Sequence, residues 1–267
     1  MTTTRRAPAL FLGHGSPMNA IENNALSRSW RTLGVEIGRP RAILMVSAHW
    51  ETKGVRLTGA ERPRTIHDFR GFPPALHAIQ YPAPGDPGLA SEAAQLLAPW
   101  QAEVDSGGWG LDHGAWSILV WMYPKADVPV VQLSLDMTRG PEDHYAMGQA
   151  LRPLRDRGVM VMGSGNIVHN LRAVNFRDPT PYPWATAYDA AVRGRLEARD
   201  DEALIGWRDL TADAALAAPD PEHVLPLLYV LGAADPGEAP WIFNGEVASS
   251  LSMTSVAFGL DRAAAAA

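Results

Sequence analysis

The chain has 267 residues, of which 46% are hydrophobic and 19% are charged, and its formal net charge is -6 at pH 7. This composition is typical of a soluble globular protein and argues against a disordered or fibrous one. The acidic balance, without a run of Lys or Arg, argues against nucleic-acid and membrane partners, because both bind through a basic surface, and favours a small-molecule substrate.

The chain contains no cysteine. This excludes disulfides, thiolate-bound zinc, cysteine-ligated iron–sulfur clusters and covalently attached c-type haem. A metal in this chain must therefore be held by His, Asp, Glu or water. The N-terminal segment lacks the apolar core of a signal peptide, and no stretch approaches the roughly 20 apolar residues of a membrane span, so we expect a cytoplasmic protein.

Short apolar runs alternate with stretches of helical periodicity along the chain. Pro153 should divide the helix in which it lies, and Asp220 with Pro221 should open the last helix. In chain order we predict strands at 9–12, 42–46 and 54–58, helices at 90–97 and 116–122, a strand at 128–134, a helix at 142–157, a strand at 159–162, helices at 185–198 and 222–231, and a strand at 252–258.

Strands that alternate with helices predict an α/β fold. We expect a single domain over residues 1–267, with a mixed central β-sheet flanked by helices in a three-layer α/β/α arrangement. The Ala-rich tail at 263–267 should be a frayed end. Residues 63–88 are dense in Pro and Gly, and so long an insertion in a compact domain is more often a lid or a pocket wall than filler.

Five of the eight histidines stand in short Gly, Ser, Asn or Pro settings. Imidazole is the commonest protein ligand for first-row transition metals. His14, His49 and His169 each follow a predicted strand, and the carboxyl ends of parallel strands meet in one crevice. A lone histidine is usually structural, but three in the same setting predict a metal site. The other two of the five are His113 and His223, while His77 and His144 are expected to be structural residues of surface helices or turns.

Nine motifs in the same order resemble the class III extradiol aromatic ring-opening dioxygenases, and within them the 4,5-DOPA dioxygenase branch. Together they extend from about Ala9 to Gly259 and so cover nearly the whole chain. The motifs lie at 12–18 (Leu-Gly-His-Gly-Ser-Pro-Met), 46–50, 66–69, 72–73, 81–85, 112–114, 164–170, 181–185 and 221–223.

The resemblance implies that His14, His49 and His223 bind one non-haem Fe(II). The wider family has a Glu where this branch resembles a His, and Glu222 stands next to His223. Neighbours on a helix point more than a quarter-turn apart, so the two side chains cannot readily exchange places. The resemblance favours His223.

His169 resembles the active-site base of the family, and it would complete a tetrahedral shell if Zn(II) occupied the site. It is therefore a candidate both as catalytic base and as metal ligand. His113 resembles a second active-site histidine that contacts substrate or oxygen, the alternative being a helix-start histidine that bonds backbone. Within the insertion, His67 and Phe72 are candidates for substrate binding.

The function implied is the opening of a catechol ring, DOPA-like by resemblance, with dioxygen. A neutral imidazole such as His169 suits the removal of a catechol proton. Two other classes stay open: a zinc-dependent hydrolase that activates water with the same histidines, and a non-catalytic metal-binding or interaction protein on the same fold. Arg70 is a candidate clamp for a substrate carboxylate, and the sequence leaves the oligomeric state open.

Overall fold

The computed structural model describes residues 6–260, in which an eight-stranded sheet has the order β4-β3-β5-β2-β6-β1-β10-β7. The four central strands, β5, β2, β6 and β1, are parallel, whereas β3 pairs with β5 and β10 with β1 in antiparallel fashion. The strands are β1 Ala9–Gly13, β2 Ala42–Thr52, β3 Arg56–Thr58, β4 Glu103–Asp105, β5 Val130–Asp136, β6 Val159–Gly165, β7 Trp241–Phe243 and β10 Ser255–Phe258, and a separate hairpin contains β8 Val247–Ala248 and β9 Leu251–Ser252.

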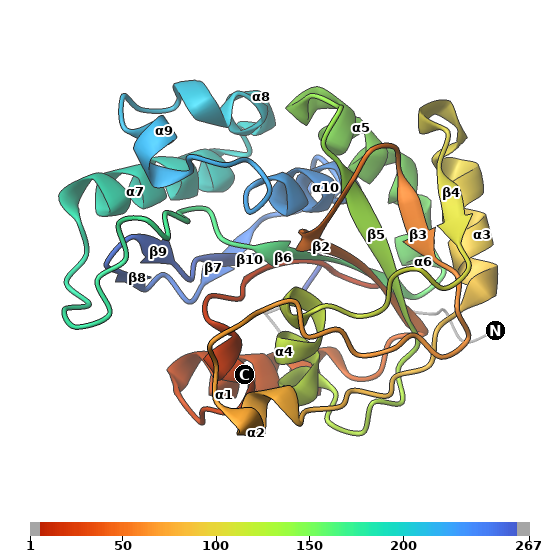
Figure 1. The fold of residues 1–267 in the computed structure, drawn as a ribbon. Coiled ribbons are helices and arrows are strands. Elements are labelled where there is room, and N and C mark those ends of the chain that lie inside the picture. The colour runs from red at the N-terminus through yellow and green to blue at the C-terminus, as the bar shows by residue number, and fades with distance from the viewer. Residues whose placement is uncertain (1–5, 261–267) are drawn as a thin grey trace.

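Helices cover both faces of the sheet, which confirms the predicted three-layer α/β/α fold with a mixed sheet (Figure 1). One layer contains α3 Pro87–Leu96, α5 Pro141–Leu151, α6 Pro153–Asp156, α7 Pro183–Ala198, α8 Asp201–Ile205, α9 Ala214–Ala217 and α10 Leu225–Ala233. The other contains α1 Ala25–Ile37, α2 Pro74–His77 and α4 His113–Met122. Short 3-10 helices lie at Pro17–Ala20, Ala98–Trp100 and Trp207–Asp209.

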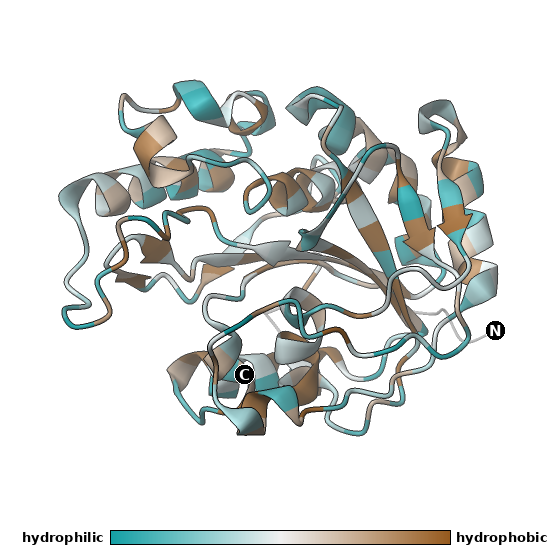
Figure 2. Ribbon diagram, in the orientation of Figure 1, coloured by the Kyte–Doolittle hydropathy of each residue, from teal (hydrophilic) through white to brown (hydrophobic). Residues whose placement is uncertain are grey.

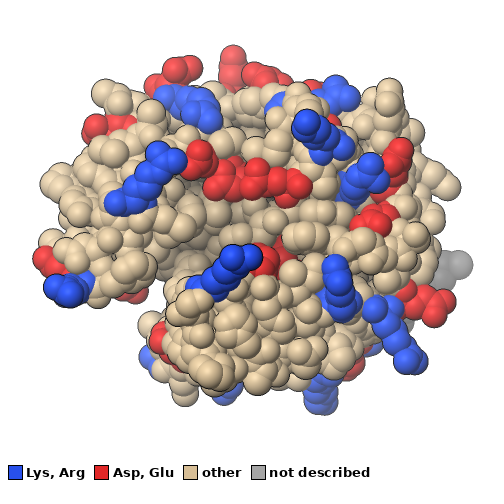
Figure 3. Space-filling view, in the orientation of Figure 1, with Lys and Arg blue, Asp and Glu red and all other residues tan. Residues whose placement is uncertain are grey.

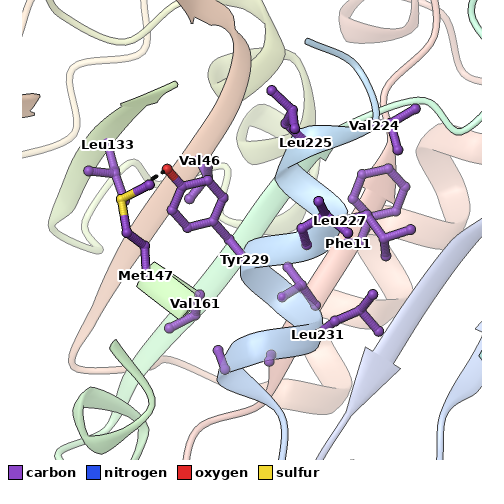
Figure 4. Close-up of a cluster of buried hydrophobic side chains, with 14 of the residues drawn as sticks. Phe11, Val46, Leu133, Met147, Val161, Val224, Leu225, Leu227, Tyr229 and Leu231 are labelled. Atoms are coloured by element: carbon purple, nitrogen blue, oxygen red, sulfur yellow. Dashed lines mark hydrogen bonds between the residues drawn. The ribbon is translucent and has the colours of Figure 1, made fainter. Parts of the chain in front are cut away.

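Alternate residues of the parallel strands pack in two hydrophobic cores, one on each face of the sheet, because successive side chains of a strand point to opposite sides. Phe11 and Val46 pack in the core beneath α10, whereas Leu10 and Met45 pack beneath α1 and α4. Figure 2 shows hydrophobic residues concentrated on the strands and hydrophilic ones on the outer turns of the helices. Figure 4 shows the buried hydrophobic side chains, among them Tyr229, that lie between α10 and the sheet.

Several predicted elements are confirmed with small shifts at their ends, among them the helix that Pro153 divides into α5 and α6. The predicted strand at 252–258 is wrong as a single strand. It is interrupted at Met253 and Thr254, so that Ser252 ends β9 in the hairpin while β10 begins at Ser255 in the main sheet. The Ala-rich tail at 263–267 lies outside the described residues.

Two histidine settings differ from the prediction. His49 lies within β2 and not beyond it, because β2 continues to Thr52. The pairing of β2 with β5 shifts register between Val46 and Glu51, and such a bulge re-aims the side chains within it. His223 precedes the last helix instead of belonging to it, since α10 begins at Leu225 and Asp220 does not cap it.

Among the described residues, no helix combines the length and apolar character needed to cross a membrane.

Candidate metal centre

Five imidazoles converge at the carboxyl ends of the parallel strands. In the sheet β6 lies between β2 and β1, so the side chains that follow these strands reach one place although the chain separates them. His14 follows β1, His49 lies in the bulge of β2, and His169 comes shortly after β6. His113 is the first residue of α4, and His223 stands just before α10.

The backbone permits this convergence at two glycines. The carbonyl of His223 accepts a hydrogen bond from Asn166 N at 3.0 Å, which seats the His223 segment on the end of β6. A Cβ on Gly165 would lie 2.2 Å from that carbonyl oxygen, so no larger residue fits. Likewise, a Cβ on Gly114 would lie 2.8 Å from the ring of His49.

The five histidines line one cavity of about 570 Å³. The insertion contributes part of its wall through Asp68, Phe69 and Phe72, and the segment after His169 contributes the exposed apolar side chains of Leu171 and Phe176. Glu51 and Glu222 also line the cavity. A pocket of this size with an apolar wall and a few convergent polar groups suits a small aromatic ligand.

Three of the imidazoles form a nearly equilateral triangle. The ring centres are 4.9 Å apart for His14 and His49, 5.3 Å for His14 and His223, and 5.1 Å for His49 and His223. Two imidazoles that bind one metal at about 2.1 Å with a near-tetrahedral angle have ring centres about 5 Å apart. The triangle therefore has the size that a single metal ion requires.

The remaining two rings do not share this spacing. The ring centre of His113 is 3.9 Å from that of His49 and 5.7 Å from that of His14, although the three residues bring ring nitrogens within 4.8 Å of one another. His169 stacks on His223 with ring centres 3.4 Å apart and planes 12° from parallel. Stacked rings cannot both direct a nitrogen at one ion with a wide angle between the bonds. The ring spacing is compatible with His14, His49 and His223 around one ion. The possible ligand atoms within 4.8 Å of one another form two other groups, His14 with His49 and His113, and His169 with Glu222 and His223.

Hydrogen bonds at Nδ1 orient two rings of the triangle, those of His14 and His223. The Ser164 hydroxyl donates to Gly114 O at 2.6 Å, so its oxygen accepts from Nδ1–H of His14 at 2.9 Å. Nδ1–H of His223 donates to Glu222 Oε1 at 2.9 Å. These two rings therefore keep an unprotonated Nε2 for the centre of the cluster, as metal-binding histidines oriented by a second residue do.

Among the described residues, one Nε2 of the triangle has no hydrogen-bond partner, and the other two contact each other. Nε2 of His223 is buried without a hydrogen bond among the described residues, and Nε2 of His14 lies 3.1 Å from Nε2 of His49. Buried nitrogens are normally bonded, and two adjacent lone pairs repel unless a cation or proton lies between them. This donor set fits a divalent metal with an affinity for nitrogen.

The surroundings keep the imidazoles of His14, His169 and His223 uncharged near neutral pH. Burial, followed by the neighbouring histidines, holds the pKa of His14 and of His223 well below the usual value. Burial is also the main cause that lowers the pKa of His169 to about 4, with Asp220 acting in the opposite direction. Neutral imidazoles can bind a metal or accept a proton at neutral pH.

The structure agrees only in part with the predictions for the three remaining histidines. His67 does not line the cavity, and its Nε2 bonds to Ile79 O at 3.0 Å. His77 is exposed at the end of α2. The prediction of a surface position for His144 is wrong: its side chain is buried, with Nδ1 3.1 Å from the hydroxyl of Tyr229, because α5 packs against α10 at this point.

Sequence reasoning assigned no role to Ser164, Asp68 or Glu51. Ser164 follows the β6 apolar run, and Asp68 lies within the quoted 66–69 motif, but which histidine each residue contacts depends on strand order. Glu51 reaches the cavity only because β2 continues beyond its predicted end. Arg70 is exposed and does not line the cavity.

Comparisons with known proteins agree on the family. Residues 8–259 match the family described as the catalytic LigB subunit of aromatic ring-opening dioxygenase. The chain is 49% identical over 263 residues to 4,5-DOPA dioxygenase extradiol of Escherichia coli (strain K12), covering 96% of each chain, and 40% identical over 230 residues to the Beta vulgaris protein of the same name, covering 84% of this chain and 85% of that one. A solved structure of an uncharacterized Escherichia coli K12 protein superposes with a TM-score of 0.83 at 46% identity, over 94% of this chain and 99% of that chain.

Proposed function

The chain belongs to the family of the catalytic LigB subunit of aromatic ring-opening dioxygenases, and we propose that it opens the ring of a catechol bearing an amine-containing, DOPA-like side chain, at Fe(II) held by three histidines. Its resemblance to the extradiol ring-cleaving dioxygenases is confirmed. It is an oxidoreductase of that class, and the family is metal-dependent. The side chain of the substrate, the identity of the metal and the roles of the individual residues are the parts that we propose.

The observation that carries the proposal is the triangle of His14, His49 and His223. Its ring spacing, the unpartnered Nε2 of His223 and the close approach of Nε2 of His14 to Nε2 of His49 fit one divalent ion. When bound, Fe(II) would supply a centre at which the catechol and dioxygen meet, so that their encounter becomes an intramolecular step. Zn(II) suits the same three nitrogen donors.

His169 and His113 would act on the substrate directly. His169 lines the cavity beside His223 and is uncharged, so it can take a catechol proton and return it to the product. Its stacked position favours this role over a place in the metal shell. His113 lines the opposite part of the histidine cluster, next to His49. Phe69 and Phe72 would pack against the catechol ring. Their place in the cavity lining supports a pocket-wall role for the 63–88 insertion.

The charge of the pocket supports an amine-bearing substrate. Glu51 and Glu222 line the cavity, and no Lys or Arg is among its described lining residues. The space-filling view shows acidic side chains gathered above a hollow on this face, with Lys or Arg side chains below it and to its left (Figure 3). Such a negative mouth attracts a cation and repels a carboxylate. The relatives named for 4,5-DOPA act, by their names, on an amino-acid catechol.

The function is tested by loading the protein with Fe(II) under anaerobic conditions and then measuring oxygen uptake and the absorbance of ring-opened product. The catechol panel contains dopamine, L-DOPA, 4-methylcatechol and 3,4-dihydroxybenzoate. We expect catechol-dependent uptake with the highest kcat/KM for the two amines and the lowest for 3,4-dihydroxybenzoate. Absence of uptake for all four would contradict the proposal, and hydrolysis by the Zn(II)-loaded protein would favour the hydrolase instead. A preference for 3,4-dihydroxybenzoate would contradict only the proposal that the substrate has an amine-bearing side chain.

Glu51→Gln should weaken the discrimination by charge. Because Glu51 is largely exposed, its attraction for an ammonium group is worth at most about 1 kcal/mol, so we expect KM for dopamine to rise by about two- to five-fold. KM for uncharged 4-methylcatechol and the metal content should not change. The matched control is Glu61→Gln, an exposed glutamate outside the cavity lining. Equal changes in KM for both catechols would show that Glu51 acts on the pocket in general.

A further inference from the structure

Asp68 contacts His113 at two points. Its Oδ1 accepts the backbone N–H of His113 at 2.9 Å, and its Oδ2 lies 2.8 Å from Nδ1 of the same residue. Oδ2 is also 3.6 Å from Nδ1 of His49. The side chain of Asp68 is only 15% exposed and that of His113 only 7%, so water competes little for these bonds.

The two contacts have a simple structural origin. His113 is the first residue of α4, and the first N–H groups of a helix have no acceptor within it. Asp112 caps the helix by accepting from Ala115 N, which leaves the N–H of His113 for Asp68. A carboxylate at this end is also favoured by the helix dipole. Asp68 is therefore held ionised in a place where it can only accept hydrogen bonds from His113.

We propose that Asp68 is a positioning residue that fixes the tautomer of His113. With Nδ1–H donated to the carboxylate, the neutral ring has its lone pair on Nε2, the nitrogen that remains for the pocket. His113 then accepts a hydrogen bond from a catechol hydroxyl, and it cannot donate one while neutral. This inference rests on the proposed function, because it specifies how His113 meets the substrate.

The same contact links the pocket wall to this histidine. Asp68 belongs to the 63–88 insertion and precedes Phe69, whose ring centre lies 5.5 Å from that of His113 with the planes at 86°. Phe69 also lines the cavity. Thus one residue anchors the insertion to the start of α4 and orients a histidine that faces the substrate.

The test is Asp68→Asn, which retains the shape but replaces one acceptor with a donor. If the amide oxygen keeps the backbone N–H, the amide nitrogen faces Nδ1 and drives the proton of His113 to Nε2. We expect kcat for ring opening to fall by about 10²–10⁴, the range seen when a catalytic histidine loses its base character or its correct tautomer. Metal content and Tm should stay close to wild type. Asp86→Asn, which alters the capping carboxylate of α3, is the matched control and should leave kcat unchanged.

Two further measurements separate positioning from a general structural role. In ¹⁵N-edited NMR spectra of the Zn(II)-loaded protein, His113, assigned by the signals lost in His113→Gln, should carry its proton on Nδ1 in wild type and on Nε2 in Asp68→Asn. In a His113→Ala background, Asp68→Asn should cause no further loss of kcat. An Nε2–H tautomer in wild type, full activity of Asp68→Asn, or additive losses would overturn the proposal. If wild type opened no catechol, the proposed function would fail, while the NMR result would still decide the tautomer.

Discussion

Alanine variants of His14, His49 and His223 are each expected to lose the bound metal, retaining less than about a tenth of the wild-type content after dialysis, and to lose ring-opening activity with it. Each variant removes one of three nitrogen donors from a triangle that matches one ion. The two remaining imidazoles then offer only two nitrogens to the ion. Metal content by elemental analysis and dissociation constants from competition with a chelator measure the effect.

Two controls make the ligand assignment specific. His77→Ala removes an exposed histidine and should retain full metal content. Glu222→Gln keeps an oxygen near His223 but weakens the acceptor for its Nδ1–H, and loss of such support typically costs 10- to 100-fold in affinity. Full occupancy in His223→Ala, combined with loss in Glu222→Ala, would identify the carboxylate as the ligand.

His169→Gln should reduce kcat by about 10²–10⁴, the usual contribution of a general acid–base, while most of the metal is retained. Glutamine keeps a polar group of similar reach but cannot accept and return a proton. The ring of His169 stacks face to face on that of His223, which leaves it beside the metal ligands and not among them. Single-turnover kinetics together with metal content provide the measurement.

The alternative role for His169 predicts a different pattern. If the metal content of His169→Gln fell as far as that of His14→Ala, His169 would be primarily a ligand. A change in KM with an unaltered kcat would instead indicate that it binds substrate without transferring a proton. Since burial lowers the pKa of His169 to about 4, the wild-type ring is uncharged near pH 7, as a proton acceptor has to be.

The sequence by itself determined the fold class, and it indicated the five histidines that line the cavity. Buried parallel strands are continuous apolar runs, so β1 and β6 were visible in the chain, and Pro153 marked the division of α5 from α6 because proline cannot continue a helix. The settings of His14 and His169 after these strands predicted their convergence. These signals depend on residues that are close in the chain, so they can be read from the sequence alone.

Only the tertiary structure decided which atoms meet. The order β2-β6-β1 places Ser164 beside His14, from which it is 150 positions distant in sequence. The pairing of the insertion with the segment before α4, through Ile66 N–H and Leu111 O, brings Asp68 to His113 across 45 positions. The bulge that aims His49 and the loop that holds His223 outside α10 were equally invisible, because each depends on partners in other strands. Local sequence carries propensity and periodicity, whereas the pairing of strands sets the distances between side chains, and chemistry at a metal site depends on those distances.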